Sequence, residues 1–80
     1  MKVKFFAQIR ELTGCDAMEL AVPDNATVDG VREQLMQQGE VWREALSANV
    51  LSARNQTLCN GSTAVCEDDE IAFFPPVTGG

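Results

Sequence analysis

The chain finishes with the sequence IAFFPPVTGG at positions 71–80, in which an apolar run precedes a proline pair and two glycines. The run from Ile71 to Phe74 is aromatic and β-branched, so it predicts a strand. Pro75 and Pro76 lack a backbone N–H and fix their own φ, so they end the strand without a paired fold-back. The last six residues can extend roughly 20 Å. This ending predicts a thin finger with a terminal carboxylate, suited to another protein's active site.

The two terminal glycines are a weak signal when taken alone. Since glycine makes up about 7% of residues, such a pair arises by chance about once in 200 chains. Frayed termini are also common. The proline pair and the aromatic strand before it favour the functional interpretation over a frayed end.

The composition indicates one small domain. The 80 residues are 45% hydrophobic, which permits a single modest core, expected over residues 1–74 with an extended tail over 75–80. The net charge of −6 argues against nucleic acid, because phosphate binding needs a basic surface. No apolar run approaches the roughly 20 residues of a membrane span, and polar residues interrupt the N-terminus before a signal-peptide core could form. We therefore expect a cytoplasmic protein with neither nucleic acid nor membrane as a partner.

The cysteines indicate no metal or thiol chemistry. Cys15, Cys59 and Cys66 form no C-x-x-C pair, and the chain contains no histidine. A zinc site is therefore not expected, and a cysteine nucleophile would lack a histidine base. The three thiols are interpreted as reduced side chains of a cytosolic protein.

Hydrophobic periodicity predicts a mixed α+β order. Strands are expected at residues 2–8, 17–22, 50–54, 57–59 and 71–74, helices at 28–38 and 40–47, and a turn or single helical turn at 10–14. Thr27 is the expected N-cap of the first helix, and Gly39 is its expected C-terminal stop. Gly30 costs up to about 1 kcal/mol relative to alanine inside a helix, which implies a close packing contact or a weak first turn. The acidic run at 67–70 is interpreted as a solvated turn rather than a metal site.

This order of elements matches a ubiquitin-like β-grasp, an α+β fold in which a mixed sheet curls around one main helix. A second short helix accompanies the main one here. Because a fold alone does not define a function, specific residues must support any functional interpretation.

Strand parity predicts an exposed apolar patch. Alternation places Val3, Phe5 and Ala7 on the core face of the first strand, with Phe6 on the outer face. The last strand likewise turns Ile71 and Phe73 inward and Phe74 outward. The first and last strands of a β-grasp are parallel neighbours, so Phe6 and Phe74 are expected side by side. Leu58 is expected to extend this patch. Exposed aromatic residues beside a reactive tail are typical of a partner surface.

Three stretches resemble one known family, the small subunit of molybdopterin synthase. They are FFAQIRELTG at 5–14, NQTL at 55–58 and AFFPPVTGG at 72–80. The resemblance spans essentially the whole chain and is most specific at its end. Two local departures are the run EDDE at 67–70, where a glycine between acids is expected, and Gly30 within the helix.

The resemblance implies a sulfur carrier that binds no cofactor itself. An E1-like enzyme would use ATP to adenylate the carboxylate of Gly80, and a sulfur donor protein would convert it to a thiocarboxylate, a 1-thioglycine. The synthase large subunit, in a heterotetramer of two small and two large subunits, would then receive the sulfur for the dithiolene of molybdopterin. Gly79 and Gly80 would form the reactive end. The residues expected to bind partners are Phe6, Leu58 and Phe74 of the patch, together with Pro75, Pro76, Val77 and Thr78 of the tail.

Other classes of protein remain open. A ubiquitin-like modifier would use the same activation but transfer its carboxyl group to a lysine amine. A sulfur carrier of thiamine biosynthesis is a further alternative, although such carriers are shorter and lack the Phe-Phe-Pro-Pro sequence that precedes the terminal glycines here. A plain interaction module with an incidental tail is the third.

Overall fold

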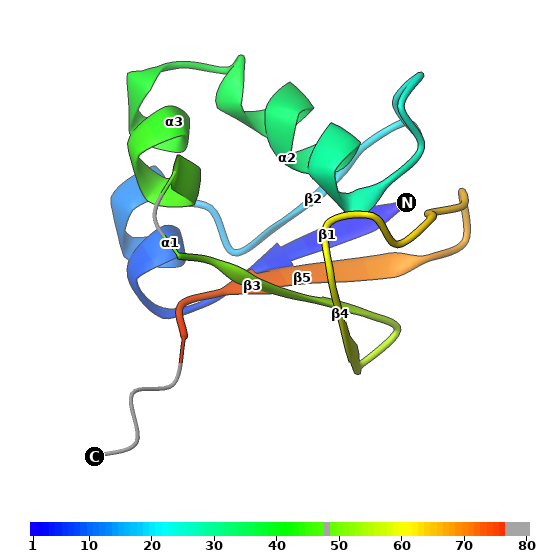
Figure 1. Ribbon diagram of the computed structural model, residues 1–80. Helices are drawn as coiled ribbons and strands as arrows, with labels where there is room; N and C mark the ends of the chain where they lie inside the picture. The colour runs from blue at the N-terminus through cyan, green and yellow to red at the C-terminus, as the bar shows by residue number, and fades with distance from the viewer. Residues whose placement is uncertain (48, 77–80) are drawn as a thin grey trace.

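The computed structural model describes residues 1–47 and 49–76, which form one sheet with helices packed on one of its sides (Figure 1). The strands are β1 (Lys2–Phe5), β2 (Ala17–Glu19), β3 (Leu51–Arg54), β4 (Thr57–Cys59) and β5 (Glu70–Phe74). The helices are α1 (Ala7–Thr13), α2 (Val28–Met36) and α3 (Glu40–Ser47). None of the helices in these two ranges is long and apolar enough to cross a membrane.

The sheet has the order β2-β1-β5-β3-β4. Its central pair, β1 and β5, is parallel, with Phe5 opposite Phe73. The other neighbouring strands are antiparallel. The parallel pairing of the first and last strands, predicted from the sequence, is therefore confirmed, and the arrangement is a β-grasp.

The core lies between the sheet and the helices. Val3, Phe5, Ile71 and Phe73 are at most 1% exposed, as strand parity predicts. The ring of Phe5 meets Trp42 edge-on at a centroid distance of 5.1 Å and stacks on Phe73 at 6.4 Å. Helix residues complete the core, and the most deeply buried of them are Ile9, Val28, Val31, Leu35 and Leu46.

The prediction of a strand over residues 2–8 is wrong in its second half. Strand β1 ends at Phe5, and α1 begins at Ala7, which has a φ of +53° and an exposed side chain. The pattern was ambiguous because Ile9 fits both the strand alternation and a helical face with Leu12. Gly14 resolves the ambiguity: it adopts the left-handed conformation (φ 68°) and its N–H donates to the Arg10 carbonyl, which is the C-terminal end of a helix.

Several other boundaries differ by a few residues. Strand β2 is shorter than the predicted 17–22, β3 begins at Leu51 instead of Val50, and β5 already includes Glu70 from the acidic run. Helix α2 ends at Met36 instead of Gln38. The bounds of α3 and β4 are as predicted.

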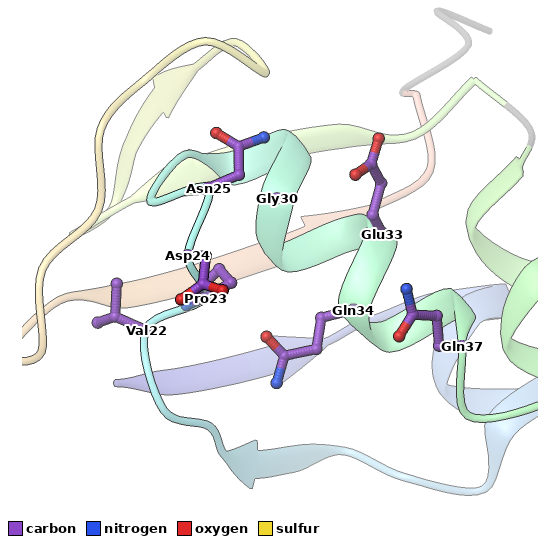
Figure 2. Close-up of a pocket in the computed structure, with 8 residues that line it drawn as sticks. All are labelled: Val22, Pro23, Asp24, Asn25, Gly30, Glu33, Gln34 and Gln37. Atoms are coloured by element: carbon purple, nitrogen blue, oxygen red, sulfur yellow. The ribbon is translucent and has the colours of Figure 1, made fainter.

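The start of α2 explains Gly30. The Thr27 hydroxyl caps the helix by accepting a hydrogen bond from the Gly30 N–H at 3.1 Å, as predicted. A Cβ at Gly30 would lie 1.8 Å from the carbonyl oxygen of Asn25, whose segment lies beside this turn (Figure 2). Of the two explanations for a glycine inside the helix, close packing is correct.

Replacing Gly30 with alanine is expected to destabilise the fold. The gain in helix propensity is at most about 1 kcal/mol, whereas overpacking a tight contact costs about 1–3 kcal/mol. We expect a net loss of about 1–2 kcal/mol in the free energy of unfolding, measured by urea titration. Asp29→Ala, in the same helical turn, is the control for propensity, and a Gly30→Ala variant as stable as wild type would contradict the packing explanation.

Candidate functional site: the outer sheet face and the root of the tail

The outer face of the sheet presents an apolar patch at the end from which the tail leaves. We call Phe6, Leu51, Leu58 and Phe74 the outer-face patch. Phe6 is 43% exposed, Leu51 37% and Leu58 65%, while Phe74 is half-buried. These side chains come from three strands and from the residue that follows β1, and the patch borders the last residues of β5.

The backbone brings Phe6 and Phe74 together. The pairing of Phe5 with Phe73 places Phe6 one position further along, level with Phe74. Phe6 is still extended (φ −130°, ψ 156°) and its N–H donates to the Phe73 carbonyl at 3.2 Å, so the pleat continues for one residue beyond β1. Its side chain therefore stays on the outer face even though the helix follows immediately. The predicted placement of this pair holds in the structure.

Leu51 was missed by the sequence analysis. It lies directly opposite Phe74 in the antiparallel pairing of β3 with β5, so both side chains share the outer face. Leu58 lies opposite Ala53, two residues along β3 from Leu51. Leu51 and Ala53 thus connect Leu58 to Phe74. The sequence shows that Leu51 is apolar. Its position opposite Phe74 depends on the register between β3 and β5, which no local sequence pattern specifies.

An ion pair joins β1 and β5 diagonally on the same face, from Lys4, two residues before Phe6, to Glu70 at the start of β5. The Lys4 ammonium lies 2.7 Å from a Glu70 carboxylate oxygen. The hydrogen bond from Lys4 lowers the pKa of Glu70 below its ordinary value, with a further contribution from the charge of Lys2. The outer face is therefore apolar at the root of the tail, and charged side chains begin directly beside the patch at Lys4 and continue to the start of β5.

The turn before β5 is tied to the β3–β4 hairpin by Asn55 and Asp69. The Asn55 amide donates to the Asp69 carboxylate at 2.9 Å, and its carbonyl oxygen accepts the Glu70 N–H at 2.9 Å. The Cys66 N–H also donates to Asp69, at 2.8 Å. The hydrogen bonds from Asn55 and from the Cys66 N–H lower the pKa of Asp69. The acidic turn is thus structural, and it fixes the strand that leads into the tail.

The Asn55–Asp69 contact predicts a pH dependence of stability. The pKa of Asp69 is lower in the folded chain than in the unfolded chain. Its ionised carboxylate therefore stabilises the fold fully above the unfolded pKa of about 3.9. This stabilisation is lost as the pH falls through the folded pKa. We expect Asn55→Gly, which tolerates the positive φ of 51°, to lower Tm at pH 7. That difference from wild type should shrink as the pH falls below the unfolded pKa, because Asp69 then takes up its proton. A Tm difference that stays constant between pH 7 and pH 2.5 would contradict this assignment.

The predicted reactive tail is only partly within the described residues. Pro75 is half-buried and Pro76 is exposed. The remaining predicted site residues, Val77, Thr78, Gly79 and Gly80, lie outside the described part of the chain. The described residues place the root of the tail directly beside Phe74 of the outer-face patch.

The cysteines do not converge on the tail root. All three are free thiols; Cys15 and Cys59 are half-buried and Cys66 is exposed. The Cys15 thiol donates to the Ala17 carbonyl, and the Cys59 thiol lies 3.6 Å from the Ser52 hydroxyl. Within residues 1–47 and 49–76, no three histidine, cysteine or acidic residues lie close enough together to hold a metal ion.

A β-grasp with an apolar outer face beside the strand that leads into its C-terminal tail defines a ubiquitin-like protein. The chain belongs to the ThiS family, whose model matches residues 3–80.

Similar proteins cover the whole chain. The molybdopterin synthase sulfur carrier subunit of Haemophilus influenzae is 54% identical over 81 residues, which cover 100% of this chain and 99% of that protein. Among solved structures, small archaeal modifier protein 1 of Haloferax volcanii has a TM-score of 0.81 at 26% identity, covering 96% of this chain and 97% of that one. A chain in the complex of subunits 1 and 2 of the molybdopterin-converting factor from Helicobacter pylori has a TM-score of 0.70 at 28% identity, covering 99% and 96%. The resemblance stated from the sequence is confirmed.

Proposed function

We propose that this chain is the sulfur carrier subunit of a molybdopterin synthase, with the sulfur bound at Gly80. The observation that supports this most strongly is the 54% identity, over the full length of both chains, to a protein of that name. The ubiquitin-like fold and the outer-face patch beside the tail root fit a carrier that presents its C-terminus to other proteins.

The proposed chemistry takes place at one carbonyl carbon. A free carboxylate is a poor electrophile, so ATP first converts it to an acyl adenylate with release of pyrophosphate. Hydrosulfide released by the donor protein then attacks the carbonyl carbon: the C–S bond forms, the C–O bond to AMP breaks, and the sulfur loses its proton. The thiocarboxylate sulfur attacks a carbon of the pterin precursor, and an oxygen substituent of that carbon leaves. Water then attacks the carbonyl carbon of the resulting thioester, the bond between that carbon and sulfur breaks, the sulfur stays on the pterin, and Gly80 returns as the carboxylate. Two such transfers supply the two sulfurs of a dithiolene.

Glycine suits both the activation of the carboxyl group and the later transfer of sulfur. It has no Cβ to obstruct a narrow channel, and it adopts backbone angles closed to other residues. The chain supplies the reacting carboxyl group, while the acid–base groups and the pterin contacts belong to its partners. On its own it is therefore not an enzyme.

The outer-face patch is the proposed docking surface for both the activating enzyme and the large subunit. A complex of the two subunits exists for the similar Helicobacter pylori protein. Aromatic anchors concentrate binding energy, and Phe6 and Phe74 lie at the root of the tail. The proposed location is the cytoplasm, in keeping with three free thiols.

A ubiquitin-like modifier is the second candidate, because the fold matches small archaeal modifier protein 1 at a TM-score of 0.81. Both functions begin with the same adenylate, but they end differently. A modifier forms an isopeptide bond with a lysine amine, whereas a sulfur carrier returns as the free carboxylate.

Reconstitution from purified proteins tests the proposed function. The chain, thiocarboxylated at Gly80, is mixed with its large subunit and the cyclic pterin precursor, and molybdopterin formation is followed. We expect product in proportion to the thiocarboxylate consumed, and none with the carboxylate form. Equal product from both forms, or none from either, would contradict the proposal.

The sulfur route predicts that the cysteines are dispensable. If sulfur is bound only at Gly80, a Cys15→Ala, Cys59→Ser, Cys66→Ser variant should still be adenylated and thiocarboxylated at close to the wild-type yield, measured by intact mass. Some loss of Tm is expected, because Cys15 and Cys59 are half-buried. A folded variant that is adenylated but never acquires sulfur would indicate a persulfide relay on this chain.

A further inference from the structure

A second apolar surface lies on the helix side of the tail root. Helices α1 and α3, the residues before β3 and the proline pair enclose a groove of about 670 Å³, which we call the α1–α3 groove. Ile9 and Ala45, at 2% and 5% exposure, are its buried base. Leu12, Val50 and the prolines form its walls.

Leu12 is conspicuous in this groove. Its side chain on α1 is 50% exposed, whereas Ile9 on the same helix is 2% exposed and belongs to the core. The polar side chains that line the groove are Gln8, Glu44 and Asn49. An apolar cleft with a few hydrogen-bonding groups, one of them anionic, fits an apolar side chain flanked by amide or basic groups.

The outer-face patch is too small to account for a stable complex. Stable specific interfaces bury roughly 800 Å² on each partner, about a sixth of the 4951 Å² surface of this chain. An aromatic side chain offers at most about 150–250 Å², and no member of the patch is more than 65% exposed. The tail that enters the partner and the surface next to the patch are the two remaining sources of buried area.

Geometry selects the α1–α3 groove as that surface. Pro75 and Pro76 form part of its wall, and the chain continues from them into the four residues that a partner must enclose. A protein whose channel surrounds those residues meets the tail root from both sides. It covers the patch on the sheet side and the groove on the helix side.

We propose that the α1–α3 groove is a second docking site for the synthase large subunit, which inserts an apolar side chain against Leu12. This inference rests on the proposed function and identifies a further surface used by the same partner. The large subunit is the occupant because it is the partner with which a similar small subunit forms a solved complex, as in the Helicobacter pylori pair.

Two matched substitutions test the proposal. Leu12→Asp and Val41→Asp each add one negative charge to a helix at a residue about half exposed, 50% and 48%, but Val41 does not line the groove. Binding of each variant to the purified large subunit is measured by calorimetry, with Tm as the check on folding. We expect Leu12→Asp to weaken binding at least tenfold and Val41→Asp to change it less than threefold. Leu12→Ala, which keeps helix propensity, should weaken binding by a smaller factor.

The outcomes separate the inference from the proposed function. Wild-type affinity in both Leu12 variants, or equal weakening by Leu12→Asp and Val41→Asp, would overturn the groove as a docking site. Weakened binding to the activating enzyme alone would overturn its assignment to the large subunit. A wild-type chain that neither binds the large subunit nor transfers sulfur to the pterin would instead contradict the proposed function.

Discussion

Removing Gly80 is expected to abolish sulfur transfer while leaving the fold intact. The reacting carbonyl carbon must lie at a fixed distance from the docking surface, and one residue changes that distance by about 3.5 Å. Because a misplacement of about 1 Å can already cost around a hundredfold in rate, we expect a loss of at least that size. Appending one alanine after Gly80 should have the same effect.

Two controls show whether a loss of activity comes from the length of the tail or from a change in folding. The buried apolar residues of the described chain lie between Met1 and Phe73, so Tm should not change in either variant. Gly80→Ala keeps the length and the carboxylate but adds a Cβ, and it should retain more activity than the deletion. Molybdopterin formation by the shortened chain at the wild-type rate would refute the fixed-length argument.

Changing Phe74 to aspartate is expected to weaken binding to both the activating enzyme and the large subunit. Phe74 lies between Phe6 and Leu51 on the outer face, so in either complex the new carboxylate would be buried against apolar side chains. For an aromatic hot spot we expect a loss of about 2 kcal/mol or more in each binding free energy, or roughly thirtyfold in Kd. Titration calorimetry with each purified partner measures this.

The stability of the same variant shows whether Phe74 belongs to the surface or to the core. Phe74 is half-buried, whereas its neighbour Phe73 is 1% exposed. We expect only a few degrees of Tm loss for Phe74→Asp, and Val41→Asp serves as the charge-matched control for binding. A large drop in Tm with unchanged affinity for both partners would show that Phe74 is a core residue.

The parts of the fold that follow local rules could be predicted from the sequence. Alternation in β1 and β5 gave the correct core faces for Phe5 and Phe73, because each strand has one buried face. A single helical turn was predicted at 10–14, but the first residues of α1 were assigned to the strand because their apolar spacing fits both a strand and a helix. Only Gly14, which adopts the left-handed conformation at the end of α1, distinguishes a helix from a strand in this segment.

The residues of the outer-face patch could be predicted only where alternation along a strand shows which face of the sheet each side chain occupies. Phe6 and Phe74 could be placed that way, and Leu58 was expected to extend the patch. Leu51 depends on the register of β3 against β5. The α1–α3 groove could not be predicted at all. It joins α1, α3 and the proline pair, three segments that are distant in sequence and meet only in the folded chain.

The central claim is that sulfur is bound at the carboxyl carbon of Gly80, and intact-mass analysis of the chain purified from its own cells tests it most directly. The account predicts a species heavier by the mass difference between sulfur and oxygen, located at Gly80 by fragmentation, which reverts to the carboxylate form on incubation with the large subunit and the pterin precursor. A chain found only as the carboxylate and as isopeptide-linked conjugates with other proteins would contradict it and identify a modifier instead.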